Sequence, residues 1–342
     1  MVFSFELIKH ANIRYRSSLG RLSRCELMAM LHALQIHCDV VEETIGGAPF
    51  LTFECRELSP LELSWLARHS AVTLMAEKRP DGSLFPLSVR RVRFLEEDCS
   101  ELLKYKGKTG AVFTRMMINT AEALSNRDPL DPSPLTVADP LCGRGTALFC
   151  ALEYGHHALG LDADKKAVHE AGVYFRKYVE FHRLKLKMSA RAETFGKVSV
   201  PVSDFVFGPK KAGPGENDSR ILTLACGDTA CLPALTRRTM PDLLVADLPY
   251  GVQHAPQSGG GTESFSHLLH RALPCWFRSL SPGGVAALSF NTYTLKPETV
   301  KEELAEAGFT VIDTDPYGSL THEVEQAVLR DVVFALKEKG GC

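Results

Sequence analysis

The stretch Leu135-Thr136-Val137-Ala138-Asp139-Pro140-Leu141-Cys142-Gly143-Arg144-Gly145-Thr146 decides the fold of this 342-residue chain. Its first four residues are largely apolar and predict a buried strand, and an apolar helix is predicted to begin at Thr146. The two glycines between them let a ligand approach the backbone closely, while the N-terminus of the helix presents unpaired N–H groups. This order predicts a ligand site at the edge of an α/β sheet.

The same loop argues against a dinucleotide ligand. The dinucleotide fingerprint places a third glycine three residues after Gly145, and that position holds Leu148. The sequence therefore disfavours NAD and FAD. A ligand that carries a positive sulfonium and an amino group in place of a diphosphate favours an acid beside the loop, and Asp139 stands there.

Three more acids follow the next predicted strands. Asp162 is placed to accept hydrogen bonds from both hydroxyls of a ribose, and Asp164 is expected to cap the following helix. Asp228 is placed to accept from an adenine amino group. The last acid opens Asp247-Leu248-Pro249-Tyr250-Gly251, in which proline and glycine turn the chain out of the sheet and free the carboxylate and the ring for a substrate. Because ligands bind at the carboxyl ends of strands in open α/β sheets, these acids predict a nucleoside-binding crevice.

Strands and helices alternate from residue 135 onward, which predicts a mostly parallel, doubly wound sheet. The last strand, Val328–Leu336, follows another strand directly and predicts one antiparallel pairing at the edge. Residues 189–219 interrupt the alternation, and their composition is typical of a mobile insertion. The other predicted strands are Leu135–Ala138, Ala158–Leu161, Arg220–Ala225, Leu243–Ala246, Val285–Phe290 and Thr310–Asp313, and helices are predicted to begin at Thr146, Lys165, Phe265 and Pro297.

The N-terminal part predicts the order strand, helix, strand, strand, helix, strand, which is typical of a ferredoxin-like α+β module. Two capping boxes, Ser23-x-x-Glu26 and Ser59-x-x-Glu62, are predicted to open the helices, and a strand at Leu87–Phe94 completes a short hairpin. We therefore divide the chain into an N-terminal domain at 1–95, a linker with a leading helix at 96–134, and a sheet domain at 135–342.

The charge balance gives no global signature of nucleic-acid binding. The chain has 39 Lys and Arg against 41 Asp and Glu, a net charge of -2, so such a surface must come from a local patch. A solvated edge strand protected by charge explains the arginines near residue 90 equally well. The candidate phosphate contacts are Arg90, Arg91, Arg93, Lys106, Lys108 and Arg115.

The ten cysteines show no C-x-x-C pair and no zinc-site spacing, so we expect reduced, mostly buried thiols and no metal site. The start of the chain lacks a basic segment followed by a long apolar core, and no stretch approaches 18 apolar residues. These patterns predict a cytoplasmic protein without a membrane partner.

With these motifs the chain resembles the class I S-adenosylmethionine (AdoMet)-dependent methyltransferases. The stretch Asp139–Thr146 is similar to their first motif, Asp162 to their ribose acid, Asp228 to their adenine-side acid, and Asp247–Tyr250 to the (Asp/Asn)-Pro-Pro-Tyr motif of enzymes that methylate exocyclic amino nitrogens. The resemblance implies a Rossmann-like methyltransferase sheet with AdoMet as cofactor. The cofactor residues that it implies are Asp139, Leu141, Cys142, Gly143, Gly145, Thr146, Asp162, Ala163, Asp228 and Thr229.

More narrowly, the chain resembles the THUMP-associated family that forms N2-methylguanosine in tRNA, typically at position ten. The Cys-Gly-x-Gly-Thr form of the first motif and the Tyr-Gly after Pro249 carry this likeness, which implies RNA, and tRNA in particular, as substrate. The chain departs from the family in two places. Leu248 replaces the usual first proline, and residues 78–104 have room for a short hairpin but not for a THUMP domain. A partner protein that supplies RNA docking is therefore one expectation.

The motif at Asp247 predicts the chemistry. The lone pair of an exocyclic amine is delocalised into its ring, so catalysis depends on positioning and on acceptors for the amino hydrogens. We expect Asp247 and the carbonyl of Leu248 to accept these hydrogens, Pro249 to keep the turn rigid, and Tyr250 to stack on the base. The alternatives are amino-methylation of DNA, another RNA or protein, a non-catalytic AdoMet-binding scaffold, and a nucleotide-dependent oxidoreductase.

Overall fold

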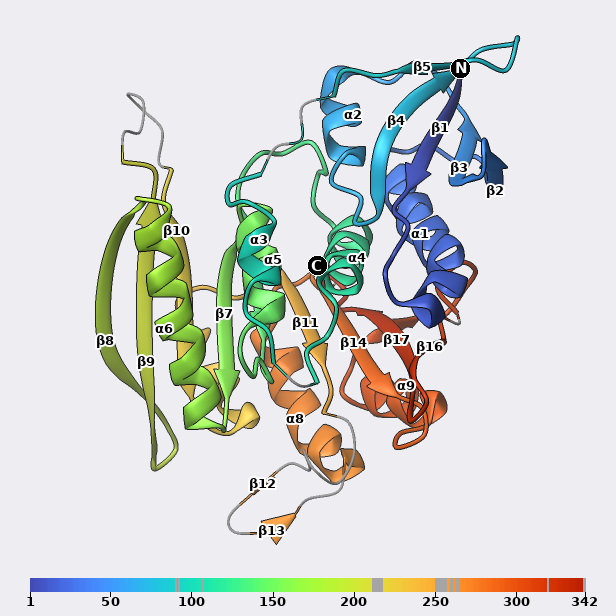
Figure 1. Ribbon diagram of the computed structural model, residues 1–342. Coiled ribbons are helices and arrows are strands. Elements are labelled where there is room, and N and C mark those ends of the chain that lie inside the picture. The colour runs from blue at the N-terminus through green and yellow to red at the C-terminus, as the bar shows by residue number, and fades with distance from the viewer. Residues whose placement is uncertain are drawn as a thin grey trace.

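The computed structural model contains two sheets that pack against each other through helices (Figure 1). The N-terminal sheet has the strand order β2-β3-β1-β4-β5, with every neighbouring pair antiparallel. Its elements are β1 (Val2–Leu7), α1 (Ile13–Ala33), β2 (Val40–Ile45), β3 (Ala48–Glu54), α2 (Pro60–Leu66), β4 (Val72–Lys78) and β5 (Leu84–Pro86). The order of the first four strands and two helices confirms the predicted ferredoxin-like arrangement. The structure describes residues 1–89, 91, 93–105, 107–210, 218–249, 257–258, 261–262, 265–318 and 320–340.

The first helix begins ten residues before the predicted capping box. Asn12 is the cap, and its side chain accepts from the backbone N–H groups of Arg14 and Tyr15. Ser23 and Glu26 lie inside α1 and are buried, so the box was misread from residues that face the core. The second box is confirmed, because both of its reciprocal hydrogen bonds are present at the start of α2.

The large sheet has the order β15-β17-β14-β11-β6-β7-β10-β9-β8, and β16 pairs with β17. Strands β10, β7, β6, β11 and β14 run parallel to one another, and β17 pairs antiparallel with β14, as predicted. The strands are β6 (Thr136–Asp139), β7 (His157–Asp162), β8 (Lys185–Phe195), β9 (Val198–Gly208), β10 (Arg220–Cys226), β11 (Leu243–Asp247), β14 (Val285–Asn291), β15 (Thr310–Ile312), β16 (His322–Glu325) and β17 (Val328–Leu336). This arrangement confirms the predicted Rossmann-like sheet with an antiparallel last strand.

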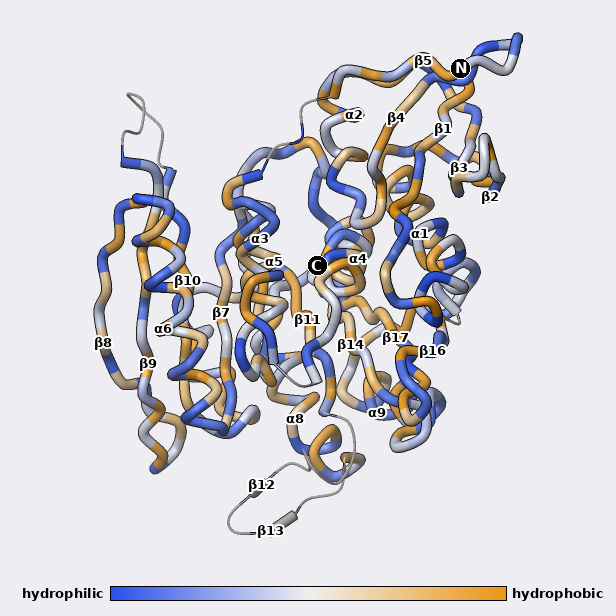
Figure 2. The backbone as a smooth tube through the Cα atoms, in the orientation of Figure 1, coloured by the Kyte–Doolittle hydropathy of each residue, from blue (hydrophilic) through white to orange (hydrophobic). Residues whose placement is uncertain are grey.

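Helices cover both faces of this sheet. Side chains of α4, α5 and α6 share one apolar core with Val137 and Val245, whereas side chains of α8 and α9 share a second core with Ala138 and Leu244. Successive strand residues thus point to opposite layers, and the buried strand β11 and its neighbour α4 are coloured mainly as hydrophobic in Figure 2. The helices are α3 (Asp98–Glu101), α4 (Ala111–Leu124), α5 (Thr146–Glu153), α6 (Lys165–Phe181), α7 (Leu232–Leu235), α8 (Phe265–Ser279) and α9 (Pro297–Glu306), with a 3₁₀ turn at Thr229–Cys231 and a small strand pair, β12 (Gln257–Ser258) and β13 (Gly261–Thr262).

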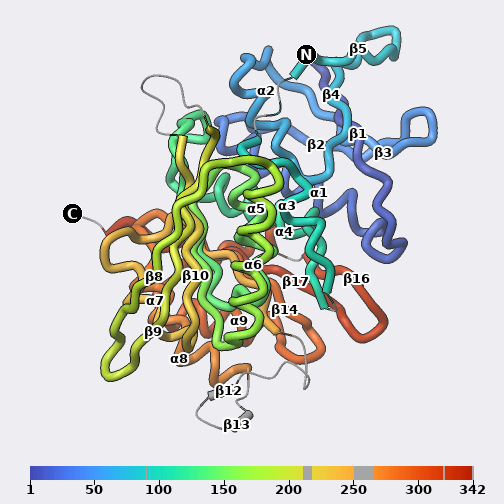
Figure 3. The backbone as a smooth tube through the Cα atoms, turned by 60° about the vertical axis from the view of Figure 1, so that its left-hand side comes forward, coloured from blue at the N-terminus to red at the C-terminus, as the bar shows by residue number. Residues whose placement is uncertain are grey.

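Two predictions about irregular segments are wrong. Most of the predicted mobile insertion at 189–219 belongs to the β8–β9 hairpin, which extends the sheet antiparallel to β10 (Figure 3). Apolar residues at alternate positions from Val198 to Val202 were the overlooked signal, since Val200 and Val202 are buried. The strand predicted at Leu87–Phe94 is also misplaced, because the observed strand, β5, lies just before it in the chain. Residues 211–217 lie outside the described part of the chain.

Buried polar contacts join the two sheets' helices. Asn119 of α4 donates to Glu26 of α1 at 2.7 Å, and Glu122 accepts from Arg68, which follows α2, at 3.1 Å. Burying these groups is tolerable because each has a hydrogen-bond partner, so the N-terminal domain is docked through α4. The boundaries at residues 95 and 134 stay predictions. None of the helices in the described ranges combines the length and the apolarity that crossing a membrane needs.

Candidate functional site

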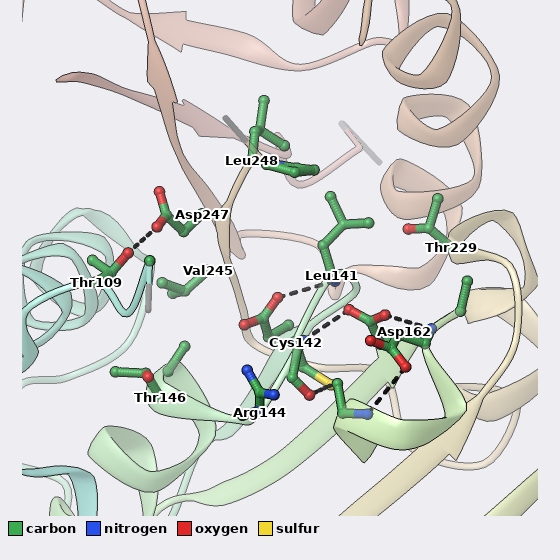
Figure 4. Close-up of a pocket in the computed structure, with 18 of the residues that line it drawn as sticks. Thr109, Leu141, Cys142, Arg144, Thr146, Asp162, Thr229, Val245, Asp247 and Leu248 are labelled. Carbon is green, nitrogen blue, oxygen red and sulfur yellow. Dashed lines mark hydrogen bonds between the residues drawn. The ribbon is translucent and has the colours of Figure 1, made fainter. Parts of the chain in front are cut away.

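A cavity of about 660 Å³ lies where β6, β7, β10 and β11 end (Figure 4). All four predicted acids line it, which places them together as expected from the parallel strands. The predicted site residues among its lining are Asp139, Leu141, Cys142, Gly143, Thr146, Asp162, Ala163, Asp228, Thr229, Asp247, Leu248 and Pro249. Gly145 is not part of the lining. Its φ of 89° makes it the left-handed residue that caps α5, a conformation that favours glycine.

Asp139 lies beneath the glycine loop. Its side chain is buried, and its Oδ1 accepts from the backbone N–H of Leu141 at 3.0 Å. Burial raises the pKa of this carboxyl well above its ordinary value, and the negative charges of Asp162 and Asp247 act in the same direction. The loop above it has room for a ligand, because a Cβ added at Gly143 would meet no atom within 4 Å.

Asp162 ties the tip of β7 to that loop. Its Oδ2 accepts from the N–H of Gly143 and its Oδ1 from the N–H of Asp164, both at 2.8 Å. Each carboxylate oxygen can accept a further hydrogen bond, so a diol can still be bound. Burial raises the pKa of Asp162 despite these two donors. Asp164 caps α6 as predicted, by accepting from the N–H groups of Lys166 and Ala167.

Asp228 is engaged by a cation that the sequence did not indicate. Arg271 of α8 donates to Oδ1 at 2.5 Å and to Oδ2 at 2.8 Å, and the N–H of Ala230 also donates to Oδ1 at 2.8 Å. Burial raises the pKa of Asp228, but the contacts with Arg271 and Ala230 outweigh it and the net shift is downward. The carboxylate is therefore ionised, and any adenine amino group must share it with Arg271.

Asp247 lies at the other end of the cavity, and its side chain is 28% exposed. Ser289 of β14 donates to its Oδ1, and Thr109, in the loop before α4, donates to its Oδ2 (Figure 4). The Nη2 of Arg330 lies 3.8 Å from that Oδ2. Leu248 is buried, and its N–H donates to the carbonyl of Ser289 at 2.8 Å, which continues the pairing of β11 with β14 through the motif. Tyr250 lies outside the described residues.

The segment before α4 forms a wall of the cavity. The hydroxyl of Tyr105 lies 2.8 Å from Oγ1 of Thr146, and the guanidinium of Arg144 lies 4.9 Å from the centre of the Tyr105 ring. Thr109 then reaches Asp247 at the far end, so one short segment touches both ends of the cavity. Tyr105, Thr109, Arg271, Ser289 and Arg330 are the site residues that sequence reasoning missed. Only Arg330 had a signal, as a charge inside an apolar strand.

The predicted phosphate contacts have structural roles or lie elsewhere. Arg115 is buried, and its Nε donates to Glu153 at 3.0 Å, so its assignment is wrong. The side chain of Arg93 is 12% exposed, pairs with Glu97 and covers the ring of Tyr154, so its assignment is also wrong. None of the four described candidates lines the cavity: Arg91 donates to the carbonyl of Thr73, Lys108 donates to the carbonyls of Ser100 and Glu101, and Arg90 and Lys106 lie outside the described residues.

One cluster of three surface side chains has the residue types that can bind a metal ion. His270, Glu303 and Glu306, on α8 and α9, bring their ligand atoms within 4.8 Å of one another. The Nδ1 of His270 lies 3.2 Å from Glu303, and an ordinary surface ion pair explains that contact. We assign no metal to this group, and the expectation of a metal-free protein stays a prediction.

Known proteins were compared with the chain. No model of a protein family matches it, and no curated protein matches it in sequence. Its structure is similar to that of TrmN from Thermus thermophilus, with 18% identity and a TM-score of 0.41 over 88% of this chain and 60% of TrmN. It is also similar to the T. thermophilus 16S rRNA N2 G1207 methyltransferase RsmC, solved with AdoMet and guanosine, with 15% identity and a TM-score of 0.38 over 88% and 58% of the two chains. The rRNA methyltransferase AviRa from Streptomyces viridochromogenes has 15% identity and a TM-score of 0.40 over 70% and 90%. The chain thus spans about three fifths of the length of the first two structures.

Proposed function

We propose that this protein is an AdoMet-dependent methyltransferase that acts on an exocyclic amino nitrogen of a nucleobase, with guanine N2 in tRNA or another RNA as the leading substrate. The observation that carries the proposal is that four acids at neighbouring strand ends share one cavity. Three of them lie around the glycine loop and the adjoining strand tips, and the fourth, Asp247, ends β11 at the opposite end of the cavity. A cavity of this kind separates a cofactor end from a substrate end.

The cofactor end fits a sulfonium nucleoside. Asp139 and Asp162 place carboxyl groups beside the loop, Asp162 keeps acceptor capacity for a ribose, and Gly143 leaves its Cβ position open. Asp228 offers an acceptor on the adenine side, shared with Arg271. When bound, AdoMet supplies a methyl group on a positively charged sulfur, which makes that carbon reactive toward a nitrogen lone pair.

The substrate end fits an amine. Asp247 is held by hydroxyl donors on both of its oxygens, and its carboxylate is the proposed acceptor for the amino hydrogens. Accepting those hydrogens raises the electron density on the nitrogen and orients its lone pair, which is the main requirement for attack on an activated methyl group. The proton released afterwards can go to Asp247 or to water. Tyr250 is proposed to stack on the base, as the motif predicts.

The test is to incubate the full chain with methyl-labelled AdoMet and, separately, with total RNA, DNA and protein, and to identify the product by mass spectrometry. We expect label in RNA as N2-methylguanosine. The Asp247→Asn variant should lose the label, and the matched variant Asp242→Asn should keep it, because Asp242 accepts from Thr136 N–H at the opposite end of the strands. Label only in DNA or protein would overturn the RNA assignment, and AdoMet binding without transfer to any pool would favour a scaffold.

A further inference from the structure

A buried arginine lies behind the proposed substrate-binding acid. Arg330 occupies the third position of the nine-residue strand β17, and its side chain is only 5% exposed. Its Nη2 lies 3.8 Å from Oδ2 of Asp247 and donates to Oγ1 of Thr109 at 3.4 Å. Thr109 in turn donates to the same Oδ2. The guanidinium therefore reaches the carboxylate both directly and through a hydroxyl.

Among the described residues, an aromatic ring and an imidazole lie next to Arg330. The guanidinium lies 4.9 Å from the ring centre of Phe113 on α4, and His322 faces Arg330 across the β16–β17 pair. The pKa of His322 is lowered to about 4, mainly by burial and also by the nearby Arg330 and Arg21, so the imidazole is neutral at pH 7. A buried cation is costly without an anion, and the carboxylate of Asp247, at the edge of the cavity, is an anion within reach of Arg330.

We propose that Arg330 is a positioning residue that, with Thr109 and Ser289, fixes the carboxylate of Asp247. Ser289 fixes Oδ1, Thr109 fixes Oδ2, and the guanidinium of Arg330 lies behind them. The carboxylate plane is then set by three segments that are far apart in sequence. This inference rests on the proposed function, because it assigns Asp247 to the substrate.

The N-terminal domain supports this arrangement from behind. Tyr15 of α1 packs edge-on against His322, with ring centres 5.6 Å apart, and the Phe113 ring lies 4.9 Å from the same imidazole. Asn12 also donates to the carbonyl of Val324 in β16 at 3.2 Å. The β16–β17 pair, which carries Arg330, thus lies between α1 and the cavity. The ferredoxin-like domain therefore supports this strand pair, which is a second role besides any contact with RNA.

The kinetic test compares Arg330→Met and Arg330→Lys with the wild type. We expect Arg330→Met to lower kcat by about 10- to 100-fold, the range expected for a misplaced reacting group, while the Kd of AdoMet changes less than about twofold. Arg330→Lys should restore part of the loss.

Arg115→Met is the matched control, since Arg115 is equally buried but is paired with Glu153 instead of Asp247. It should lose stability and keep its kcat. If Arg330→Met does not fold, the test uses Thr109→Val and Arg330→Lys. Both variants should also lower kcat, by a smaller factor. A kcat within twofold of the wild type in all three variants would overturn the proposal.

A double-mutant cycle separates this inference from the proposed function. The folding equilibrium constants of Arg330→Met, Asp247→Asn and the double variant are measured by urea unfolding, which requires no activity. We expect the two positions to be coupled by at least about tenfold in that constant. If the two positions are coupled but the protein transfers no methyl group, the positioning role of Arg330 is supported and the proposed function is contradicted. If the protein is an active methyltransferase and the two positions are not coupled, only the positioning role of Arg330 is contradicted.

Discussion

The two ends of the cavity are built in opposite ways. At the cofactor end, Asp139 and Asp164 are held by backbone N–H groups two or three residues away, and Asp162 by the neighbouring loop. At the substrate end, Asp247 is held by side chains that are 138 and 42 residues away in sequence, together with Arg330 of the last strand. Apart from Asp228, which Arg271 holds from 43 residues away, local contacts specify the first end, whereas the assembled fold specifies the second. The cofactor end should therefore tolerate changes in distant segments that disable the substrate end.

The largest expected effect is at the substrate end. Asp247→Asn keeps the size of the side chain and removes its charge, so kcat should fall by about 10²- to 10³-fold, as for loss of one preorganised electrostatic contact in a transition state. The Kd of AdoMet, measured by calorimetry on the same protein, should stay within about twofold. A large loss of AdoMet affinity in this variant would show that the two ends are not separable.

At the cofactor end, Asp162→Ala should raise the Kd of AdoMet by about 10- to 100-fold, because hydrogen bonds to a charged group are worth about 1.5–3 kcal/mol. Calorimetry measures the change. Asp242→Ala is the matched control, because its carboxylate makes a similar contact, to Thr136 N–H at 2.8 Å, away from the cavity. Equal losses in both variants would indicate a general loss of folding instead of a ribose contact.

The pH dependence sharpens the same contrast. Burial raises the pKa values of Asp139 and Asp162 in the folded protein, so these groups favour folding below the unfolded carboxyl pKa and lose that contribution as pH rises through the folded pKa. AdoMet binding needs the ionised forms of both carboxyl groups. The affinity for AdoMet should therefore fall as the pH is lowered, and the fall should begin at a pH above the ordinary pKa range of carboxyl groups. Thermal shifts with and without AdoMet across pH should therefore show a ligand effect that grows with pH. A ligand effect that shrinks as pH rises would contradict this assignment.

The smallest expected effect concerns Arg271. Its ion pair with Asp228 is partly exposed, with side chains 27% and 37% accessible, so its contribution is at most about 1 kcal/mol. Arg271→Met removes a cation from the cavity and frees both oxygens of Asp228, and it should tighten AdoMet binding by about two- to fivefold. Isothermal titration checks the direction, and weaker binding would mean that Arg271 itself contacts the ligand.

The contrast also explains what the sequence could predict. The parallel strand order, the glycine loop and the four acids follow from local patterns, because each acid directly ends an apolar strand. The start of α1 was misplaced because Ser23 and Glu26 imitate a capping box while they are buried. Thr109 and Ser289 carry no motif, and their roles depend on β14 lying beside β11 and on α4 packing over both. Such contacts between distant segments cannot be read from spacing.

The basic residues teach the same lesson from the other side. Arg93 and Arg115 were assigned to phosphate from charge alone, yet both are held by acids of the fold, with Arg115 against Glu153. Arg330 is a charge within an apolar strand, and its Nη2 lies 3.8 Å from Oδ2 of Asp247. A charge in an apolar run is therefore a stronger indication of a site than a cluster of charges on a linker.

The central claim is that the cavity binds AdoMet, and the most direct measurement is calorimetric titration of the wild-type protein with AdoMet, its demethylated product and NADH. The account predicts saturable binding of the first two with one site per chain, lost in Asp162→Ala, and no heat of binding from NADH. Binding of NADH without binding of AdoMet would contradict the account and favour the alternative that the protein is a nucleotide-dependent oxidoreductase.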